Sequence, residues 1–366
     1  MPALNLAPAL SLLLAFRDTP PVQPLRAWWR QAGRNLRPAR PRAYAPRRTN
    51  AQDAVIASGR AGWEQRATVL HEPRRGPVPT IVLGGFVPDS TEQVFLLRGQ
   101  LVRHGSVYYF NYPRHGFSAE LIAAQLADLI ADLNARHAGP PVLFAVSFGA
   151  ALVIDALRRH RDAGRPLDVA GVVLVSPVIT AADIIAPGTA KPSTLLGRAL
   201  QAFLRPDEPS AAEVEKARNL FLRMFDAGAQ NKAALIALMS AGELRRLHTR
   251  VKAAIRDIDG RGAHERVRAM LEPPPLTTDE TALTTAPTLV LYAEREDAVL
   301  DARAPSRLAL DRPCPAGFPA GITLTITQTA GPAVQHASLI FHAANFLPPI
   351  TAFYQRLKPR KFLQAA

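Results

Sequence analysis

The sequence predicts an α/β fold, in which helices cover both faces of a mostly parallel central sheet and a helical insertion precedes the last two strands. From Thr80 onward, short runs of β-branched and other apolar residues alternate with segments of helical periodicity. These apolar runs show little polar alternation, as expected for strands that are buried on both faces. Between residues 178 and 285 the helical periodicity continues, but no strand pattern occurs.

The first half of the predicted sheet follows from this periodicity in chain order. Strands are predicted at Thr80–Gly85, Ser106–Tyr112, Pro141–Val146 and Val169–Ser176. The predicted helices between them are Glu92–His104, Leu121–Arg136 and Phe148–His160. Each strand is therefore followed by a helix, which is the order of a parallel sheet.

The rest of the chain completes the sheet after a helical interruption. Within the interruption, helices are predicted at Ala211–Met224, Lys232–Met239 and Glu243–Ile258. Strands Thr288–Ala293 and Ile322–Thr327 and a helix Ser338–Leu357 follow it. We therefore divide the chain into an Arg- and Pro-rich arm (1–67), a core in two parts (68–177 and 286–366) and a helical cap insertion (178–285).

The net charge of +14 belongs mainly to the arm and its lead-in. Residues 1–78 hold 13 Arg and four acidic residues, and the stretch Arg26–Arg48 has eight Arg, three Pro and no acid. The arm contains no recognisable nucleic-acid module, so the charge does not by itself indicate a nucleic-acid partner. The pair Trp28–Trp29 among these arginines can contact a lipid surface or pack on the main domain.

The apolar segment Ala3–Phe16 lacks a preceding basic region and a cleavage site, and Pro8 interrupts it. We interpret it as an amphipathic or docking helix rather than a signal peptide. No apolar run reaches the roughly 18 residues of a membrane span. A cytoplasmic protein is predicted, and peripheral membrane contact through the arm stays open.

With Cys314 as the single cysteine and no Cys/His cluster, we expect no disulfide, metal or other cofactor.

Ser147 is the candidate nucleophile. It directly follows the third predicted strand and precedes a helix, with Ala145 two residues before it and Gly149 two residues after it. A strand–Ser–helix turn this tight requires small residues at both positions, and the pattern A-x-S-x-G is a variant of the nucleophile elbow. The alternative is a serine that merely begins a helix.

A serine nucleophile requires a base and an acid that orients the base. His336 lies in a loop after the last strand and is the predicted base, whereas His342 is assigned to packing or the surface. Asp297 follows the strand Thr288–Ala293 and is the predicted acid. The neighbouring carboxylates Glu294, Glu296 and Asp301 compete with it, and a helix cap is the alternative role.

An oxyanion hole would require two backbone N–H groups. The expected donors are Phe148, which follows the nucleophile, and Phe86, which follows Gly84-Gly85. The glycines allow the backbone to approach a substrate closely, although they also fit a plain turn at the end of a strand.

Taken together, the chain from about Thr68 to Leu357 resembles the α/β-hydrolase superfamily. The resemblance rests on the following features: Gly84-Gly85-Phe86, the segment 111–118 (NYPRHGFS), which is similar to the family's D-x-x-G-x-G-x-S, the Ser147 elbow, and Asp297 with His336. It departs from the common pattern by Ala145 in place of Gly, Val146 in place of His and Asn111 in place of Asp.

The resemblance implies acyl transfer: Ser147 attacks an ester or thioester, His336 takes its proton, and Asp297 orients His336. A Ser at the elbow excludes the epoxide hydrolase chemistry of this superfamily, which uses an Asp there. Apolar residues of the insertion divide between core and an acyl pocket; they are Leu195, Leu196, Leu200, Phe203, Leu204, Leu220, Phe221, Leu222, Met224 and Phe225. The alternatives are an acyltransferase on the same fold and a non-catalytic partner protein.

Overall fold

The computed structural model describes residues 40–357, except 75, 137–138, 186–190, 229–234, 236–238 and 330. The apolar segment Ala3–Phe16, the pair Trp28–Trp29 and most of the predicted helix Lys232–Met239 therefore lie outside the described residues. No helix among the described residues is long and apolar enough to span a membrane.

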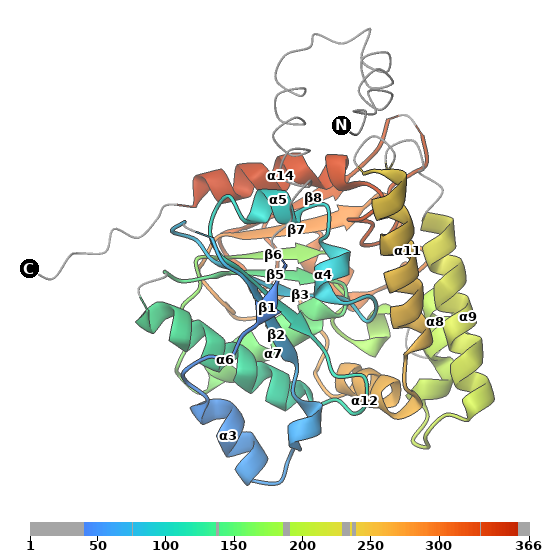
Figure 1. The fold of residues 1–366 in the computed structure, drawn as a ribbon, viewed down its shortest axis with the longest axis horizontal. Coiled ribbons are helices and arrows are strands. Elements are labelled where there is room, and N and C mark those ends of the chain that lie inside the picture. The colour runs from blue at the N-terminus through green and yellow to red at the C-terminus, as the bar shows by residue number, and fades with distance from the viewer. Residues whose placement is uncertain are drawn as a thin grey trace, which may run out of the picture.

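An eight-stranded sheet forms the centre of the molecule (Figure 1), with the strand order β1-β2-β4-β3-β5-β6-β7-β8. The six strands from β3 onward run parallel to one another; they are β3 (Thr80–Leu83), β4 (Val107–Asn111), β5 (Val142–Val146), β6 (Gly171–Val175), β7 (Thr288–Ala293) and β8 (Gly321–Ile326). The predicted mostly parallel sheet is confirmed.

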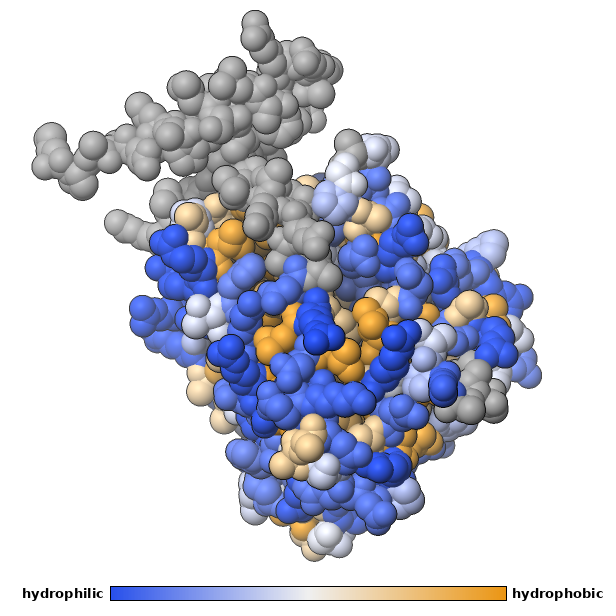
Figure 2. Space-filling model, turned by 90° about the vertical axis from the view of Figure 1, so that its right-hand side faces the viewer, coloured by the Kyte–Doolittle hydropathy of each residue, from blue (hydrophilic) through white to orange (hydrophobic). Residues whose placement is uncertain are grey.

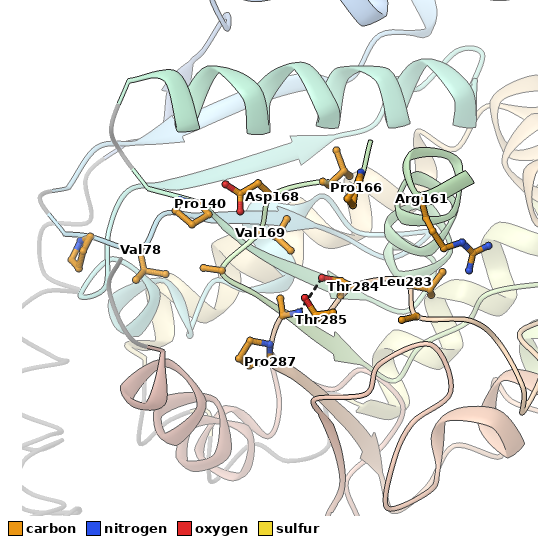
Figure 3. Close-up of a pocket in the computed structure, with 15 residues that line it drawn as sticks. Val78, Pro140, Arg161, Pro166, Asp168, Val169, Leu283, Thr284, Thr285 and Pro287 are labelled. Atoms are coloured by element: carbon orange, nitrogen blue, oxygen red, sulfur yellow. Dashed lines mark hydrogen bonds between the residues drawn. The ribbon is translucent and has the colours of Figure 1, made fainter. Parts of the chain in front are cut away.

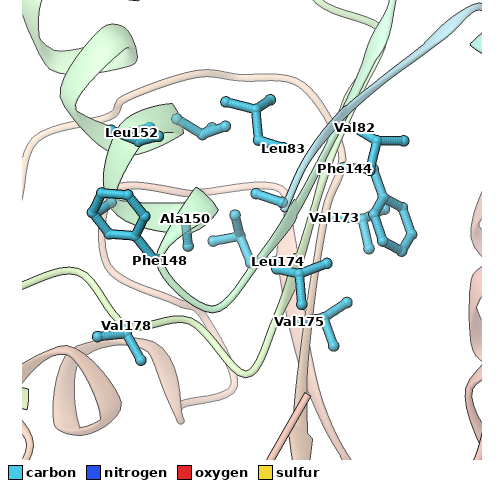
Figure 4. Close-up of a cluster of buried hydrophobic side chains, with 14 of the residues drawn as sticks. Val82, Leu83, Phe144, Phe148, Ala150, Leu152, Val173, Leu174, Val175 and Val178 are labelled. Carbon is cyan, nitrogen blue, oxygen red and sulfur yellow. The ribbon is translucent and has the colours of Figure 1, made fainter. Parts of the chain in front are cut away.

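Every residue of β3, β5, β6 and β7 is buried, because helices cover both faces of the sheet. In Figure 1, α5 (Arg98–Leu101) and α14 (Ala343–Arg356) lie on one face, and α6 (Ala119–Ala135) and α7 (Gly149–Asp162) lie on the other. Figure 4 shows part of this core, where side chains of β3, β5 and β6 lie beside the start of α7.

Two predicted helices differ from the structure. Glu92–His104 forms two short helices, α4 (Ser90–Gln93) and α5, with an irregular turn between them. The last helix begins at Ala343 rather than Ser338, because residues 338–342 form tight turns in which His342 N–H donates to Ser338 O. A short helix, α13 (Pro305–Leu310), precedes β8, whereas the sequence predicts a helix that begins near Ala298.

The described residues between β6 and β7 form helices and no strand. The insertion contains α8 (Leu195–Leu200), α9 (Ala211–Gly228), α11 (Ala241–Arg256) and α12 (Gly260–Leu271). Figure 1 shows α8, α9 and α11 beside one end of the sheet. The sequence analysis missed α12, whose first turn contains Gly260 and Gly262; Asp259 stabilises its start by accepting a hydrogen bond from Gly262 N–H at 3.0 Å.

The predicted boundary of the arm at residue 67 is wrong for residues 42–57. The strand β1 (Arg42–Ala43) pairs with β2 (Thr68–Glu72), which in turn pairs antiparallel with β4. The helix α3 (Asn50–Ala57) is fixed to α6, because the Asp128 carboxylate accepts hydrogen bonds from Ala51 N–H and Gln52 N–H, both at 3.0 Å. A buried carboxylate satisfies the free N–H groups at the helix start, so this segment belongs to the body of the protein.

Candidate active site

Ser147 lies at the carboxyl end of β5, where the chain reverses into α7. Its φ of +50° is uncommon for a residue with a side chain, and Ser147 N–H donates to Val175 O at 2.9 Å. A Cβ at Gly149 would lie 2.4 Å from Leu83 O, so only glycine fits at that position. The tight turn predicted from the sequence is therefore present, and its backbone holds the serine at the edge of the sheet.

His336 lies against Ser147, as its position in the loop after β8 predicted. The distance from His336 Nε2 to Ser147 Oγ is 2.9 Å. His336 Nδ1 contacts a carboxylate, so Nδ1 carries the proton and Nε2 is free to accept the Ser147 hydroxyl hydrogen. The structure thus brings together the two residues that the sequence analysis paired across 189 positions.

The carboxylate that contacts His336 belongs to Glu296, which corrects the prediction of Asp297. His336 Nδ1 donates to Glu296 Oε2 in a short hydrogen bond, and Glu296 is 2% exposed. The other oxygen of Glu296 accepts from Ser176 Oγ and from Ala293 N–H, both at 2.7 Å. Every oxygen of this buried carboxylate is therefore satisfied, which a buried charge requires.

The chain beyond β7 explains why Glu296 takes this place. Arg295 forms an isolated parallel bridge with Gln335, so the chain after the strand stays beside the histidine loop. A turn then begins at Glu296, whose C=O accepts a hydrogen bond from Val299 N–H at 2.9 Å; Glu296 is buried there, whereas Arg295 and Asp297 are exposed. Glu294 instead accepts from Val334 N–H at 2.7 Å, which fixes the backbone of the histidine loop.

Ser176 is a site residue that the sequence analysis did not identify. It follows β6, has a φ of +45°, donates to Glu296 and accepts a hydrogen bond from Ala337 N–H at 2.9 Å. The three described residues other than glycine with positive φ are Ser147, Ser176 and Ala337, all at this edge of the sheet. Such backbone strain is typical of functional sites. The signal available in the sequence was a serine at the carboxyl end of a neighbouring strand.

The predicted oxyanion donors, Phe86 and Phe148, flank Ser147 on two different loops. Their rings contact each other edge-to-face with centroids 5.8 Å apart. Neither backbone N–H donates to another of the described residues. The preceding glycines are fixed from outside, since Gly84 N–H donates to Ser90 Oγ at 2.9 Å and Gly85 N–H to Gln93 Oε1 at 2.6 Å. This leaves both phenylalanine amides available to a ligand.

Comparison with known proteins reveals likeness in structure alone. No protein-family model and no curated protein matches the sequence. Solved structures match the fold. An esterase from Thermogutta terrifontis superposes with a TM-score of 0.51 at 17% identity, over 80% of this chain and 94% of the esterase. A membrane phospholipase A superposes with a TM-score of 0.54 at 16% identity, over 96% of this chain and 95% of the phospholipase. An epoxide hydrolase from Bacillus megaterium superposes with a TM-score of 0.53 at 9% identity, over 79% of this chain and 98% of the epoxide hydrolase.

The chain has the α/β-hydrolase fold. Within this fold the segment 111–118, which resembles the family motif, forms a loop after β4 that contacts the insertion. Gly116 in this loop has a φ of +77°, and Ser118 accepts a hydrogen bond from Leu121 N–H at the start of α6. Glu265 of α12 accepts a hydrogen bond from Phe117 N–H. The loop is therefore fixed from both sides.

Arg266 connects the insertion to the predicted oxyanion loop of this α/β-hydrolase fold. Its guanidinium donates to Phe86 O at 2.8 Å and to Pro113 O at 2.7 Å. It also lies over the rings of Phe86, Tyr112 and Phe117, with 5.5 to 5.7 Å between the guanidinium carbon and the ring centroids. Burial lowers the pKa of Arg266 to about 10. One cation from α12 thus fixes two loops of the core.

An apolar cavity of about 270 Å³ opens beside Ser147 and His336. The insertion contributes apolar side chains to its wall: Leu195, Leu196, Phe221, Met224, Phe225, Val251 and Ile255. Leu200 and Phe203, which the sequence analysis also considered, are buried in the core instead. Figure 2, which views the side that carries α9 and α11, shows apolar residues at the centre of this face with hydrophilic residues around them.

A larger pocket of about 660 Å³ lies elsewhere (Figure 3). Its wall includes one residue just before each of the strands β3, β5, β6 and β7; they are Val78, Pro140, Ala170 and Pro287. It is therefore at the amino ends of the strands, whereas ligands of parallel α/β sheets bind at the carboxyl ends. Among the described residues no group of His, Cys, Asp and Glu side chains is arranged to hold a metal.

Proposed function

We propose that this chain is a serine hydrolase that cleaves a carboxylic ester or thioester with an apolar acyl group. The observation that carries the proposal is the continuous hydrogen-bonded series from Ser147 through His336 to Glu296, which lies at the wall of an apolar cavity. This is the geometry by which an imidazole activates a serine hydroxyl.

The proposed reaction has two steps, the formation of an acyl-serine and its hydrolysis. Ser147 Oγ attacks the carbonyl carbon while its proton moves to His336 Nε2, and Glu296 stabilises the imidazolium that forms. The N–H groups of Phe86 and Phe148 hold the oxyanion. His336 then protonates the leaving oxygen or sulfur, and a water molecule, deprotonated by His336, hydrolyses the acyl-serine.

The cavity supports an apolar acyl group, because its wall beside Ser147 is formed mainly by aliphatic and aromatic side chains. Two structures with this fold, those of an esterase and a membrane phospholipase A, agree with ester hydrolysis.

Hydrolysis of a chain-length series of p-nitrophenyl esters and acyl-thioesters tests the proposal, with Ser147→Ala beside the full-length wild type. We expect turnover of medium-chain substrates by the wild type and labelling of Ser147 by a fluorophosphonate probe. Ser147→Ala should lose both, with kcat reduced by about 10⁶-fold, because the nucleophile is absent. Retention of full activity by Ser147→Ala would contradict the proposal.

A further inference from the structure

The Gln93 side chain lies beside the nucleophile and has no part in the mechanism described so far. Gln93 is the last residue of α4, is 5% exposed and contributes to the wall of the cavity that holds Ser147 and His336. A buried amide on a mainly apolar wall costs free energy unless its donors find partners. Its placement therefore requires an explanation.

The orientation of this amide follows from its contact with Gly85. Gly85 N–H lies 2.6 Å from one terminal atom of Gln93. A backbone N–H can only donate, so that atom is the carbonyl oxygen Oε1, and the other arm of the amide is Nε2 with its two hydrogens. The contact thus fixes Nε2 as a donor on the opposite arm of the amide.

The position of Nε2 is fixed by the space above Gly85. A Cβ built on Gly85 would lie 3.3 Å from Gln93 Nε2 and 3.4 Å from Ser147 Cβ. The amide nitrogen and the nucleophile therefore flank one small volume, which only a glycine leaves open. Gly85 directly precedes Phe86, whose N–H is a proposed oxyanion donor. No hydrogen bond joins Nε2 to another of the described residues.

We propose that Gln93 is a third oxyanion donor, in addition to the N–H groups of Phe86 and Phe148; this role rests on the proposed function. As the bond from Ser147 Oγ to the carbonyl carbon forms, the π electrons move to the carbonyl oxygen and the hydroxyl proton moves to His336 Nε2. The charge develops beside Nε2, where a fixed amide donor stabilises it more than it stabilises the neutral carbonyl. Gln93 is thus a catalytic residue that undergoes no covalent change.

A purely structural role is the competing explanation, because Gln93 Oε1 also anchors the Gly85 peptide. Ser90 provides a matched control. Its hydroxyl accepts from Gly84 N–H at 2.9 Å and donates to Phe110 O, so it anchors the neighbouring peptide of the same turn. Ser90 is buried away from the cavity and does not contribute to its wall. Removal of Ser90 Oγ therefore loosens the turn without removing a donor from the site.

The experiment compares Gln93→Glu, Gln93→Met and Ser90→Ala in the full chain at pH 9. An ionised Glu keeps the acceptor for Gly85 N–H and removes the donor, whereas Met removes both. The readouts are kcat and KM for a p-nitrophenyl ester and the inhibition constant of an alkyl trifluoromethyl ketone, which forms an oxyanion on reaction with a catalytic serine. Thermal unfolding checks that each variant is folded.

We expect Gln93→Glu and Gln93→Met to lower kcat by about 10²-fold, the effect of losing one oxyanion donor. The trifluoromethyl ketone should bind more weakly by a similar factor, with KM within about threefold of the wild type, because the donor acts on the charged state. Ser90→Ala should lower kcat by less than about fivefold, since it removes the two hydrogen bonds of Ser90 Oγ in the turn but no donor from the site.

Two results would overturn this role of Gln93 while leaving the proposed function intact: a Gln93→Glu variant that keeps kcat within threefold of wild type, or a Ser90→Ala variant that loses as much activity as Gln93→Met. Turnover by Ser147→Ala is a separate outcome. It would remove the proposed function and the role of Gln93 together.

Discussion

Replacement of Glu296 by Gln is the sharpest test of the site, because the substitution is isosteric and its effect on His336 follows from the contacts. Glu296 Oε1 accepts two hydrogen bonds, from Ser176 Oγ and Ala293 N–H, and Oε2 accepts one from His336 Nδ1. A glutamine has only one oxygen and must direct it to one side or the other.

The backbone decides which side the oxygen takes. The N–H of Ala293 cannot turn, so an NH₂ group placed against it would lose that hydrogen bond and set donor against donor. Each such loss costs about 1–3 kcal/mol in a buried site. The glutamine NH₂ should therefore face His336, which then holds its proton on Nε2 and cannot accept the proton of Ser147.

The wrong tautomer should lower kcat by about 10⁴-fold, the loss known for an amide at the orienting position of serine proteases. Asp297→Asn is the matched control; Asp297 is exposed, and kcat should stay within about twofold. The assay is hydrolysis of a p-nitrophenyl ester, with thermal unfolding to confirm that both variants fold. Equal losses in the two variants, or a larger loss in Asp297→Asn, would refute the assignment of Glu296.

Three further predictions follow from single contacts. Ser176→Ala leaves Ala337 N–H without an acceptor, so kcat should fall about tenfold and the free energy of unfolding by about 1–3 kcal/mol, measured by ester hydrolysis and urea unfolding. Arg266→Met should lower kcat about tenfold because Phe86 O loses its donor. The free energy of unfolding should change by no more than about 2 kcal/mol, since the loss of a buried charge offsets the lost hydrogen bonds; a stability loss without a kcat effect would contradict this. Burial lowers the pKa of His342, so its stabilising contribution is present above the unfolded pKa of about 6.5 and is lost as the pH falls from that value through the lower pKa of the folded state. His342→Asn should therefore reduce the fall in Tm between pH 7 and pH 5 without abolishing it, because burial also lowers the pKa of His71 and His104.

The sheet could be predicted because its strands are buried on both faces and leave an unbroken apolar signal in the sequence. The strand β2 gave no such signal, since it lies near the sheet edge with only two of its five residues buried. The helix α12 was missed because Gly260 and Gly262 lower its intrinsic helix propensity. The tight packing that requires Gly262, whose Cβ would lie 2.3 Å from Arg114 O, appears only in three dimensions.

The nucleophile and base could be located because each depends on a local feature, a tight turn for Ser147 and a loop position for His336. The acid could not, because three carboxylates follow β7 within four residues and the sequence does not show which of them faces the histidine loop. The bridge between Arg295 and Gln335 decides this, and it is a contact between distant segments. Ser176 and Gln93 were missed for the same reason, since their roles depend on neighbours remote in sequence.

The position of Arg266 has a consequence for how substrate preference could change in this protein. The part of the cavity wall that the insertion contributes comes from α8, α9 and α11, whereas the guanidinium that fixes the loop of Phe86 comes from α12. Evolution or protein engineering can therefore reshape the cavity through residues of α9 other than Phe221, which stacks on the Phe86 ring, while the Arg266 anchor stays in place. An exchange of the whole insertion with that of another hydrolase would remove the anchor as well, so a functional chimera should retain α12 from this chain.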